Sequence, residues 1–98
     1  MLSVQWRSEA EADLETILTY IAERNPTAAY DLLADIEQAT SQLPQHPYLY
    51  RHGRVAGTRE LVVHPNYLIV YRVTTAAIEI INVLHTRLPY LTMTAINS

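Results

Sequence analysis

Two stretches of helical periodicity meet at Asn25-Pro26, and this arrangement limits the folds open to the chain more than any other feature. The residue before a proline avoids helical angles, whereas Asn caps a helix well and Pro fits a first helical turn. A link this short predicts an antiparallel helical hairpin. Apolar residues recur at three- and four-residue spacing, namely Ala10, Leu14, Ile17, Leu18 and Ile21, then Ala29, Leu32, Leu33, Ile36, Ala39 and Leu43.

The ends of the two helices are also marked in the sequence. Ser8 and Glu11 have the spacing of a capping box, so we expect the first helix to start at Ser8. Pro44 prevents much continuation of the second helix. Residues 2–6, before the first helix, alternate apolar and polar side chains and indicate a half-buried strand.

Three runs rich in Val, Ile, Leu and Tyr follow the hairpin, at residues 58–64, 67–74 and 78–86. The links between them are short, which makes neighbouring strands antiparallel. Residues 44–57 carry two prolines and two glycines and are expected to form an exposed connector, with at most a short strand at 54–56.

Packing one helical layer on one sheet buries all of these apolar stripes. The sequence therefore predicts a single α+β domain over residues 1–98, with an N-terminal strand and an antiparallel two-helix hairpin. The hairpin packs on a twisted, mainly antiparallel sheet of three to four strands. A chain of 98 residues supports one such core and is too short for two.

Charge is distributed unevenly along the chain, whose formal net charge is −3. Residues 1–43 hold two arginines and eight acids, a net −6, whereas residues 44–98 hold five arginines and two acids, a net +3. Every permanent cation is an arginine, a side chain suited to forked contacts with phosphate or carboxylate. The acidic total argues against strong general binding of nucleic acid through phosphates.

Several classes of site and location are disfavoured by what the sequence lacks. With no cysteine, disulfides, thiolate nucleophiles and cysteine-based zinc sites are excluded. The four histidines are widely spaced, so we expect neither a metal site nor a cofactor. No apolar run could span a bilayer and no secretory pattern opens the chain, so we expect a cytoplasmic protein without membrane contact.

The order of these elements and several local strings resemble one family, the RelE/ParE superfamily of toxins from bacterial toxin-antitoxin modules. The similarity extends over roughly residues 4–90 and is greatest to the ParE branch. The strings are Trp6 before residues 8–14, Asn25-Pro26 with Ala28-Ala29, residues 43–47, residues 57–61, residues 67–73 and residues 83–87.

The resemblance implies a toxin that a cognate antitoxin holds inactive, in a module of the kind that stabilises plasmids. ParE-type toxins poison DNA gyrase, whereas RelE-type toxins cleave mRNA in the ribosomal A site without a metal. A third possibility is a degenerate member that only binds antitoxin and acts as a co-repressor. In each case operator DNA would be contacted only through the antitoxin.

Metal-independent RNA cleavage needs a base, a cation for the phosphate and an acid for the leaving oxygen. By resemblance, the candidates for these roles are His85, Arg87, Arg59 and Tyr90. This chain departs from the ribonuclease pattern, because many members carry arginine at the position of Leu68 and a second arginine at that of Leu88. It also has no lysine. These departures favour binding of a protein target, DNA gyrase, over catalysis.

The residues expected to contact the target or the antitoxin are Arg59, Arg72, His85, Arg87, Tyr90 and Leu91. Arg87 lies two residues after His85 and so shares its face, which makes a joint anion-binding surface possible. Simpler interpretations compete with these roles. Arg59 is equally well explained as a solvated strand arginine tied to a helix acid, and His85 as a histidine hydrogen-bonded at the sheet edge. His64, beside Pro65-Asn66, is better explained as a turn residue.

Overall fold

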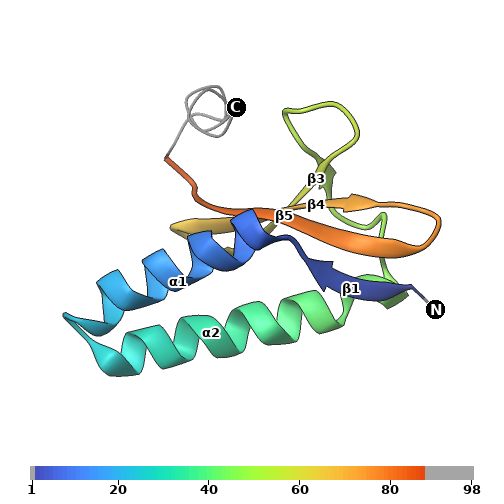
Figure 1. The fold of residues 1–98 in the computed structure, drawn as a ribbon. Coiled ribbons are helices and arrows are strands. Elements are labelled where there is room, and N and C mark those ends of the chain that lie inside the picture. The colour runs from blue at the N-terminus through green and yellow to red at the C-terminus, as the bar shows by residue number, and fades with distance from the viewer. Residues whose placement is uncertain (1, 88–98) are drawn as a thin grey trace.

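The computed structural model describes residues 2–87, which form two helices, one short 3-10 helix and five strands (Figure 1). In chain order these are β1 (Ser3–Trp6), α1 (Ser8–Ala22), α2 (Pro26–Ser41), η1 (Leu43–Gln45), β2 (Arg51–His52), β3 (Arg59–His64), β4 (Tyr67–Val73) and β5 (Ala77–His85). The predicted α+β arrangement is confirmed. No helix within residues 2–87 is long and apolar enough to cross a membrane.

Asn25 and Pro26 join α1 to α2 as the sequence predicted. The Asn25 side chain accepts a hydrogen bond from the backbone N–H of Ala28 at 3.1 Å, and Pro26 occupies the first turn of α2. Pro26 offers no N–H that would need a partner there, and Asn25 satisfies one of the N–H groups that the helix leaves free. The hairpin turn is therefore fixed by these two residues.

The predicted capping box at the start of α1 is wrong. Arg7 occupies the N-cap in an extended conformation and no side chain caps the helix, while Ser8 is already helical and its hydroxyl lies 3.4 Å from Glu9 Oε2. The reason lies in the preceding strand. The backbone N–H of Arg7 donates to Ile80 O at 3.0 Å, which holds Arg7 extended and places the cap one residue before Ser8.

The strands form one five-stranded sheet in the order β1-β5-β4-β3-β2. All neighbours are antiparallel except β1, which runs parallel to β5 and pairs Ser3 with Ala77 through Trp6 with Ile80. The sheet thus has five strands, because β1 and the two-residue strand β2 lie at the two edges of the three long strands.

Residues 54–56, where the sequence allowed at most a short strand, do not form one. These residues lie in a tight turn in which the Thr58 N–H donates to Val55 O at 3.2 Å and Gly57 has a φ of 80°. A positive φ suits glycine and reverses the chain direction. The pairing segment is consequently displaced to Arg51–His52, which lies opposite Glu60 and Arg59.

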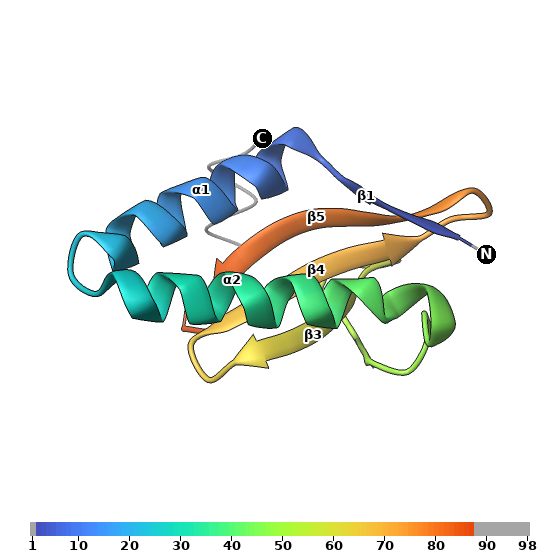
Figure 2. The ribbon, with the colours of Figure 1, turned by 90° about the horizontal axis from the view of Figure 1, so that it is seen from below.

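Both helices lie across one face of the sheet, as Figure 2 shows from below. The core between the layers contains Ala10, Leu32, Ile36, Leu43, Leu61, Ile69, Tyr71, Ile78, Ile80 and Val83. Alternate residues of β4 point the other way and form a second apolar cluster on the face away from the helices, which we call the open face. This cluster contains Leu68, Val70 and Leu84, with Ile81 packed against it.

Candidate functional site

Arg59 is engaged by the connector between the helices and the sheet. Its guanidinium donates to Tyr50 O at 2.8 Å and to Tyr48 O at 3.3 Å, and it lies 5.1 Å from the centre of the Tyr48 ring. Arg59 therefore holds the connector against β3 instead of pairing with a helix acid. Its contact with a target or antitoxin stays a prediction.

Tyr71 supports the same connector from the core. Its hydroxyl donates to Pro47 O at 2.9 Å, while the residue as a whole is buried. Burial raises the pKa of Tyr71 from 10.0 to about 12, since the phenolate would lose water; the nearby Arg59 charge opposes this shift and Tyr50 adds to it. The phenol is thus held neutral as a hydrogen-bond donor.

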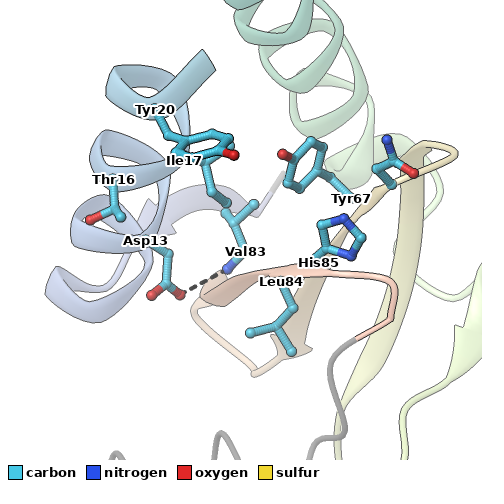
Figure 3. Close-up of a pocket in the computed structure, with 9 residues that line it drawn as sticks. Asp13, Thr16, Ile17, Tyr20, Tyr67, Val83, Leu84 and His85 are labelled. Carbon is cyan, nitrogen blue, oxygen red and sulfur yellow. Dashed lines mark hydrogen bonds between the residues drawn. The ribbon is translucent and has the colours of Figure 1, made fainter. Parts of the chain in front are cut away.

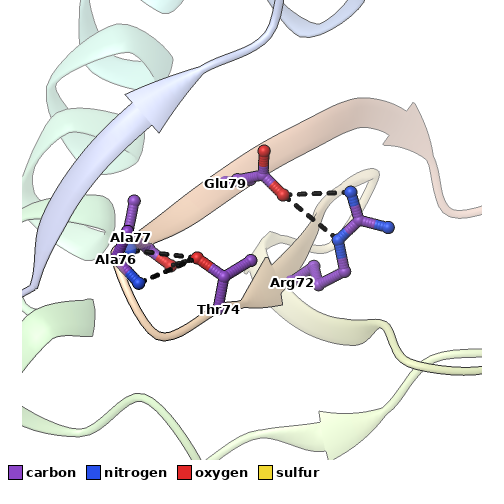
Figure 4. Close-up of polar contacts among 5 residues, drawn as sticks. All are labelled: Arg72, Thr74, Ala76, Ala77 and Glu79. Carbon is purple, nitrogen blue, oxygen red and sulfur yellow. Dashed lines mark hydrogen bonds and ion pairs between the residues drawn. The ribbon is translucent and has the colours of Figure 1, made fainter.

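Arg72 is paired within the sheet (Figure 4). Its Nε and Nη2 both donate to Glu79 Oε1, at 3.1 and 3.0 Å, from opposite positions on β4 and β5. Both side chains are partly exposed. The charge of Arg72 is therefore largely compensated in this structure, and a partner would have to compete with Glu79 for it.

His85 ends β5, and its ring contacts Tyr67 edge-on at a centroid distance of 5.3 Å. Its Nδ1 accepts the backbone N–H of Arg87 at 3.1 Å, so the neutral ring carries its proton on Nε2. Arg87 itself lies in the turn after the strand, where strand alternation no longer applies. Strand alternation therefore does not place Arg87 on the face of His85, and their joint anion-binding surface stays a prediction.

His64 lies on the other side of Tyr67, with a ring distance of 5.8 Å, and its Nδ1 accepts the N–H of Asn66 at 3.0 Å. The structure thus brings two imidazoles together around one phenol. Arg59 is remote from this group, because it pairs with Tyr71 while His85 pairs with Tyr67. Four residues of strand separate these positions by about 13 Å. Tyr90 and Leu91 lie outside the described residues.

The open face carries no cluster of cations at its centre in the part of the chain that the structure describes. Leu68, in the position where the resemblance led us to look for arginine, is buried beside Val70 and Leu84. Next to them Glu60 has a side chain only 3% exposed, and its Oε1 accepts from Arg51 Nε at 2.8 Å. The other oxygen, Oε2, is buried and has no hydrogen-bond partner among residues 2–87.

A groove of about 640 Å³ opens between α1 and the end of β5, and we call it the α1–β5 groove (Figure 3). Helix α1 contributes Asp13, Ile17 and Tyr20 to it, and the sheet contributes Tyr67, Val83 and His85. One oxygen of Asp13, Oδ2, accepts from both Asn82 Nδ2 and the Val83 N–H, each at 3.0 Å. This carboxylate therefore fastens α1 to β5.

Sequence reasoning missed the α1 side of this groove, because none of the predicted site residues lies on a helix. A signal was present. Asp13, Thr16 and Tyr20 have helical spacing along the edge of the apolar stripe, and with Ile17 of that stripe they line the groove. A stripe that mixes a carboxylate and an aromatic ring with an apolar residue indicates a helix face of intermediate burial.

Comparison with known proteins gives consistent matches. Residues 4–90 match the family described as "ParE toxin of type II toxin-antitoxin system, parDE". Toxin RelE2 of Caulobacter vibrioides is 36% identical over 87 residues, which cover 87% of this chain and 96% of that protein. Putative toxin Y4kP of Sinorhizobium fredii is 36% identical over 83 residues, covering 84% and 85% of the two chains.

Among solved structures, the chromosomal ParDE toxin-antitoxin system from P. aeruginosa contains a chain with a TM-score of 0.76 and 25% identity, covering 87% of this chain and 96% of that one. The YoeB dimer from Staphylococcus aureus shares the fold alone, with a TM-score of 0.62 at 13% identity over 85% of this chain and 94% of that one. The fold, the family match and these relatives agree: the chain belongs to the RelE/ParE superfamily, in the family of ParE toxins of type II toxin-antitoxin systems, and its partner is a cognate antitoxin.

Proposed function

We propose that this toxin stops growth by binding a protein target, DNA gyrase, and that it acts in the cytoplasm without catalysing a reaction of its own. The observation that carries the proposal is the apolar centre of the open face, where Leu68 is buried with Val70 and Leu84. An in-line attack on RNA needs a cation beside the reacting phosphate. A leucine in an apolar cluster supplies none.

The arrangement of the remaining candidates supports the same proposal. Arg59 is bound to two carbonyl oxygens of the connector, and Arg72 is paired with Glu79. Arg87 has an exposed side chain that makes no hydrogen bond or ion pair within residues 2–87. Such an arginine suits a contact with an acidic surface of a protein partner, where rim charges mainly guide association and specificity.

Ribosome-dependent cleavage of mRNA is the second candidate, and one observation favours it. His64 and His85 flank Tyr67, and each has its Nδ1 occupied by a turn N–H so that Nε2 points elsewhere. Two imidazoles and a phenol are groups that can move protons near neutral pH. This alternative requires the phosphate to be neutralised by a cation that the ribosome or a more distant arginine provides.

The test combines a cellular and a purified assay. The chain is induced in bacteria without antitoxin, and RNA ends and the DNA-damage response are measured in the same cultures. The purified chain is then added to gyrase with relaxed plasmid and ATP. We expect intact transcripts, an induced damage response and loss of supercoiling. Arg87→Ala should weaken the inhibition several-fold, whereas the matched exposed arginine variant Arg7→Ala should leave it unchanged.

Two outcomes would replace the gyrase proposal. Cuts in mRNA at the ribosomal A site that disappear in His85→Ala would establish the ribonuclease alternative. A folded chain that is not toxic, and that binds its antitoxin, would indicate a module retained only for antitoxin binding and co-repression.

A further inference from the structure

The α1–β5 groove combines an apolar floor with aromatic walls and one carboxylate. Ile17 and Val83 form the apolar part, and the rings of Tyr20 and Tyr67 stand on either side of the hollow (Figure 3). Asp13 lies at the end nearest the start of α1. The groove can therefore hold an elongated side chain that is apolar along its length and polar at its tip.

Several polar atoms at the edge of the groove make no hydrogen bond within residues 2–87. Asp13 directs only Oδ2 at Asn82 and Val83, so its other oxygen, Oδ1, remains available as an acceptor. The hydroxyls of Tyr20 and Tyr67 make no hydrogen bond to a described residue. Two phenols can donate or accept, but the carboxylate oxygen only accepts, so the set favours a ligand that donates.

The structure already shows that Tyr20 binds a guanidinium. The Cζ atom of Arg24 lies 3.7 Å from the centre of the Tyr20 ring, outside the residues that line the groove. A Tyr48 ring receives Arg59 in the same way. Because the negative face of an aromatic ring attracts a cation, the side of Tyr20 turned to the groove offers a second position of this kind.

The charges around the groove favour a ligand of positive charge. Glu15 and Glu23 line the hollow that continues from Tyr20 along α1. Arg24 lies 3.8 Å from Glu23, so its charge is opposed by a neighbouring acid. With Asp13, the described edge of the groove is net negative. An anion would be repelled there and a cation attracted.

From this geometry we propose that the α1–β5 groove binds an arginine side chain inserted by a basic segment of a partner protein. The stem of the arginine passes between the rings of Tyr20 and Tyr67 and packs on Ile17 and Val83. Its guanidinium donates to Asp13 Oδ1 at the end of the groove nearest the start of α1. The contact lies between the helices and the sheet end, away from the open face. It is independent of whether gyrase is the target.

The experiment uses the full chain labelled with 15N and the short peptide acetyl-Leu-Arg-Leu-amide as the probe. We expect saturable shifts of the amide signals of Asp13, Tyr20, Tyr67 and Val83. A peptide with citrulline in place of arginine keeps the shape without the charge, and it should bind about 10-fold more weakly, as expected for loss of a charge-assisted contact. Added salt should also weaken binding of the arginine peptide.

Matched variants locate the contact. Tyr20→Ala should weaken binding about 5-fold through loss of the aromatic face, whereas Tyr30→Ala, which removes another exposed tyrosine from the hairpin, should not change it. Asp13→Asn keeps an acceptor for the Val83 N–H but removes the charge, and should weaken binding about 10-fold. Retention of the other amide signals would show that each variant is folded.

The proposal would be overturned by equal affinity for the arginine and citrulline peptides, by tighter binding of a glutamate peptide, or by shifts confined to other surfaces. Gyrase inhibition by a chain that fails this peptide test would refute the groove proposal and leave the proposed function standing. Peptide binding by a chain that does not affect gyrase would support the groove proposal and refute the proposed function.

Discussion

The phenol of Tyr71 links the pH dependence of folding to a single side chain. Its pKa is about 12 in the fold and 10.0 ordinarily, so above pH 10 the unfolded chain loses this proton more readily. The stabilisation of the fold by the neutral Tyr71 phenol is complete below pH 10. It is lost as pH rises towards 12, and the free energy of unfolding falls by about 2–3 kcal/mol in total. Urea unfolding of wild type and Tyr71→Phe at pH 8 to 11.5 checks this.

In that comparison, Tyr71→Phe should lose about 1 kcal/mol at pH 8 with the hydrogen bond to Pro47, and should then decline less steeply than wild type. The other six tyrosines are common to both proteins, so the comparison isolates the effect of replacing Tyr71. Parallel stability curves for the two proteins would show that the ionisation of Tyr71 is not linked to folding.

The buried carboxylate of Glu60 depends on a single partner. Removing the guanidinium in Arg51→Met would leave Glu60 buried and uncompensated, whereas Arg51→Met combined with Glu60→Leu removes both charges. The Arg51 side chain is 60% exposed, so water screens the pair and we expect a loss of about 1–3 kcal/mol for the single variant.

The double variant should return to within about 1 kcal/mol of wild type, since an apolar residue of similar size fits beside Val70. Denaturant unfolding of the four proteins in the cycle gives the coupling energy. A single variant as stable as wild type would contradict the dependence of the buried Glu60 carboxylate on Arg51.

The roles of these side chains could not be predicted from sequence, because each depends on contacts between distant segments. Arg59 was identified as a candidate, but its attachment to Tyr48 and Tyr50 arises from the path of the connector. The pairing of Arg51 with Glu60 likewise requires the register of a strand only two residues long. Position in the sequence indicates that an arginine is available, and the fold decides what it binds.

The two helix starts provide an internal comparison of capping. Asn25 accepts a backbone N–H at the start of α2, so Asn25→Ala should cost about 1 kcal/mol of stability. Ser8 makes no such bond at the start of α1, and Ser8→Ala should change stability by less than about 0.5 kcal/mol. Urea unfolding of both variants checks the pair, and equal losses would contradict the difference between the two caps.

Elements defined by local patterns were predictable, and those defined by pairing were not. The helices and the three long strands follow from apolar periodicity, Asn25-Pro26 and the turn residues, and the structure has all of them. Residues 2–6 also form the expected strand, but alternation alone did not reveal that it runs parallel to β5. The turn at Gly57 displaced the short strand, because a single positive φ changes which residues can reach β3.

Across the molecule, the hairpin and the sheet present different chemistry to partners. The acidic half of the sequence forms the helices and one wall of the α1–β5 groove, whereas five of the seven arginines belong to the half that forms the connector and β2 to β5. A toxin that must meet both an antitoxin and a target can use such surfaces separately. The proposed arginine contact at the groove and the proposed target contact at Arg87 follow this division.

Strand β1 connects these halves, because it pairs with the edge of β5 and leads directly into α1. Deleting residues 2–6 would remove the packing of Leu2, Val4 and Trp6 on the core and would leave β5 with unpaired backbone groups along residues 77–80. We expect a loss of about 3–5 kcal/mol, comparable to truncating a large core residue. We also expect concentration-dependent self-association through the exposed edge, measured by light scattering after size exclusion.

Gln5→Ala, an exposed change within β1, should remain stable and monomeric. A deleted chain that stays monomeric with wild-type stability would mean that the parallel pairing of β1 contributes little to the fold.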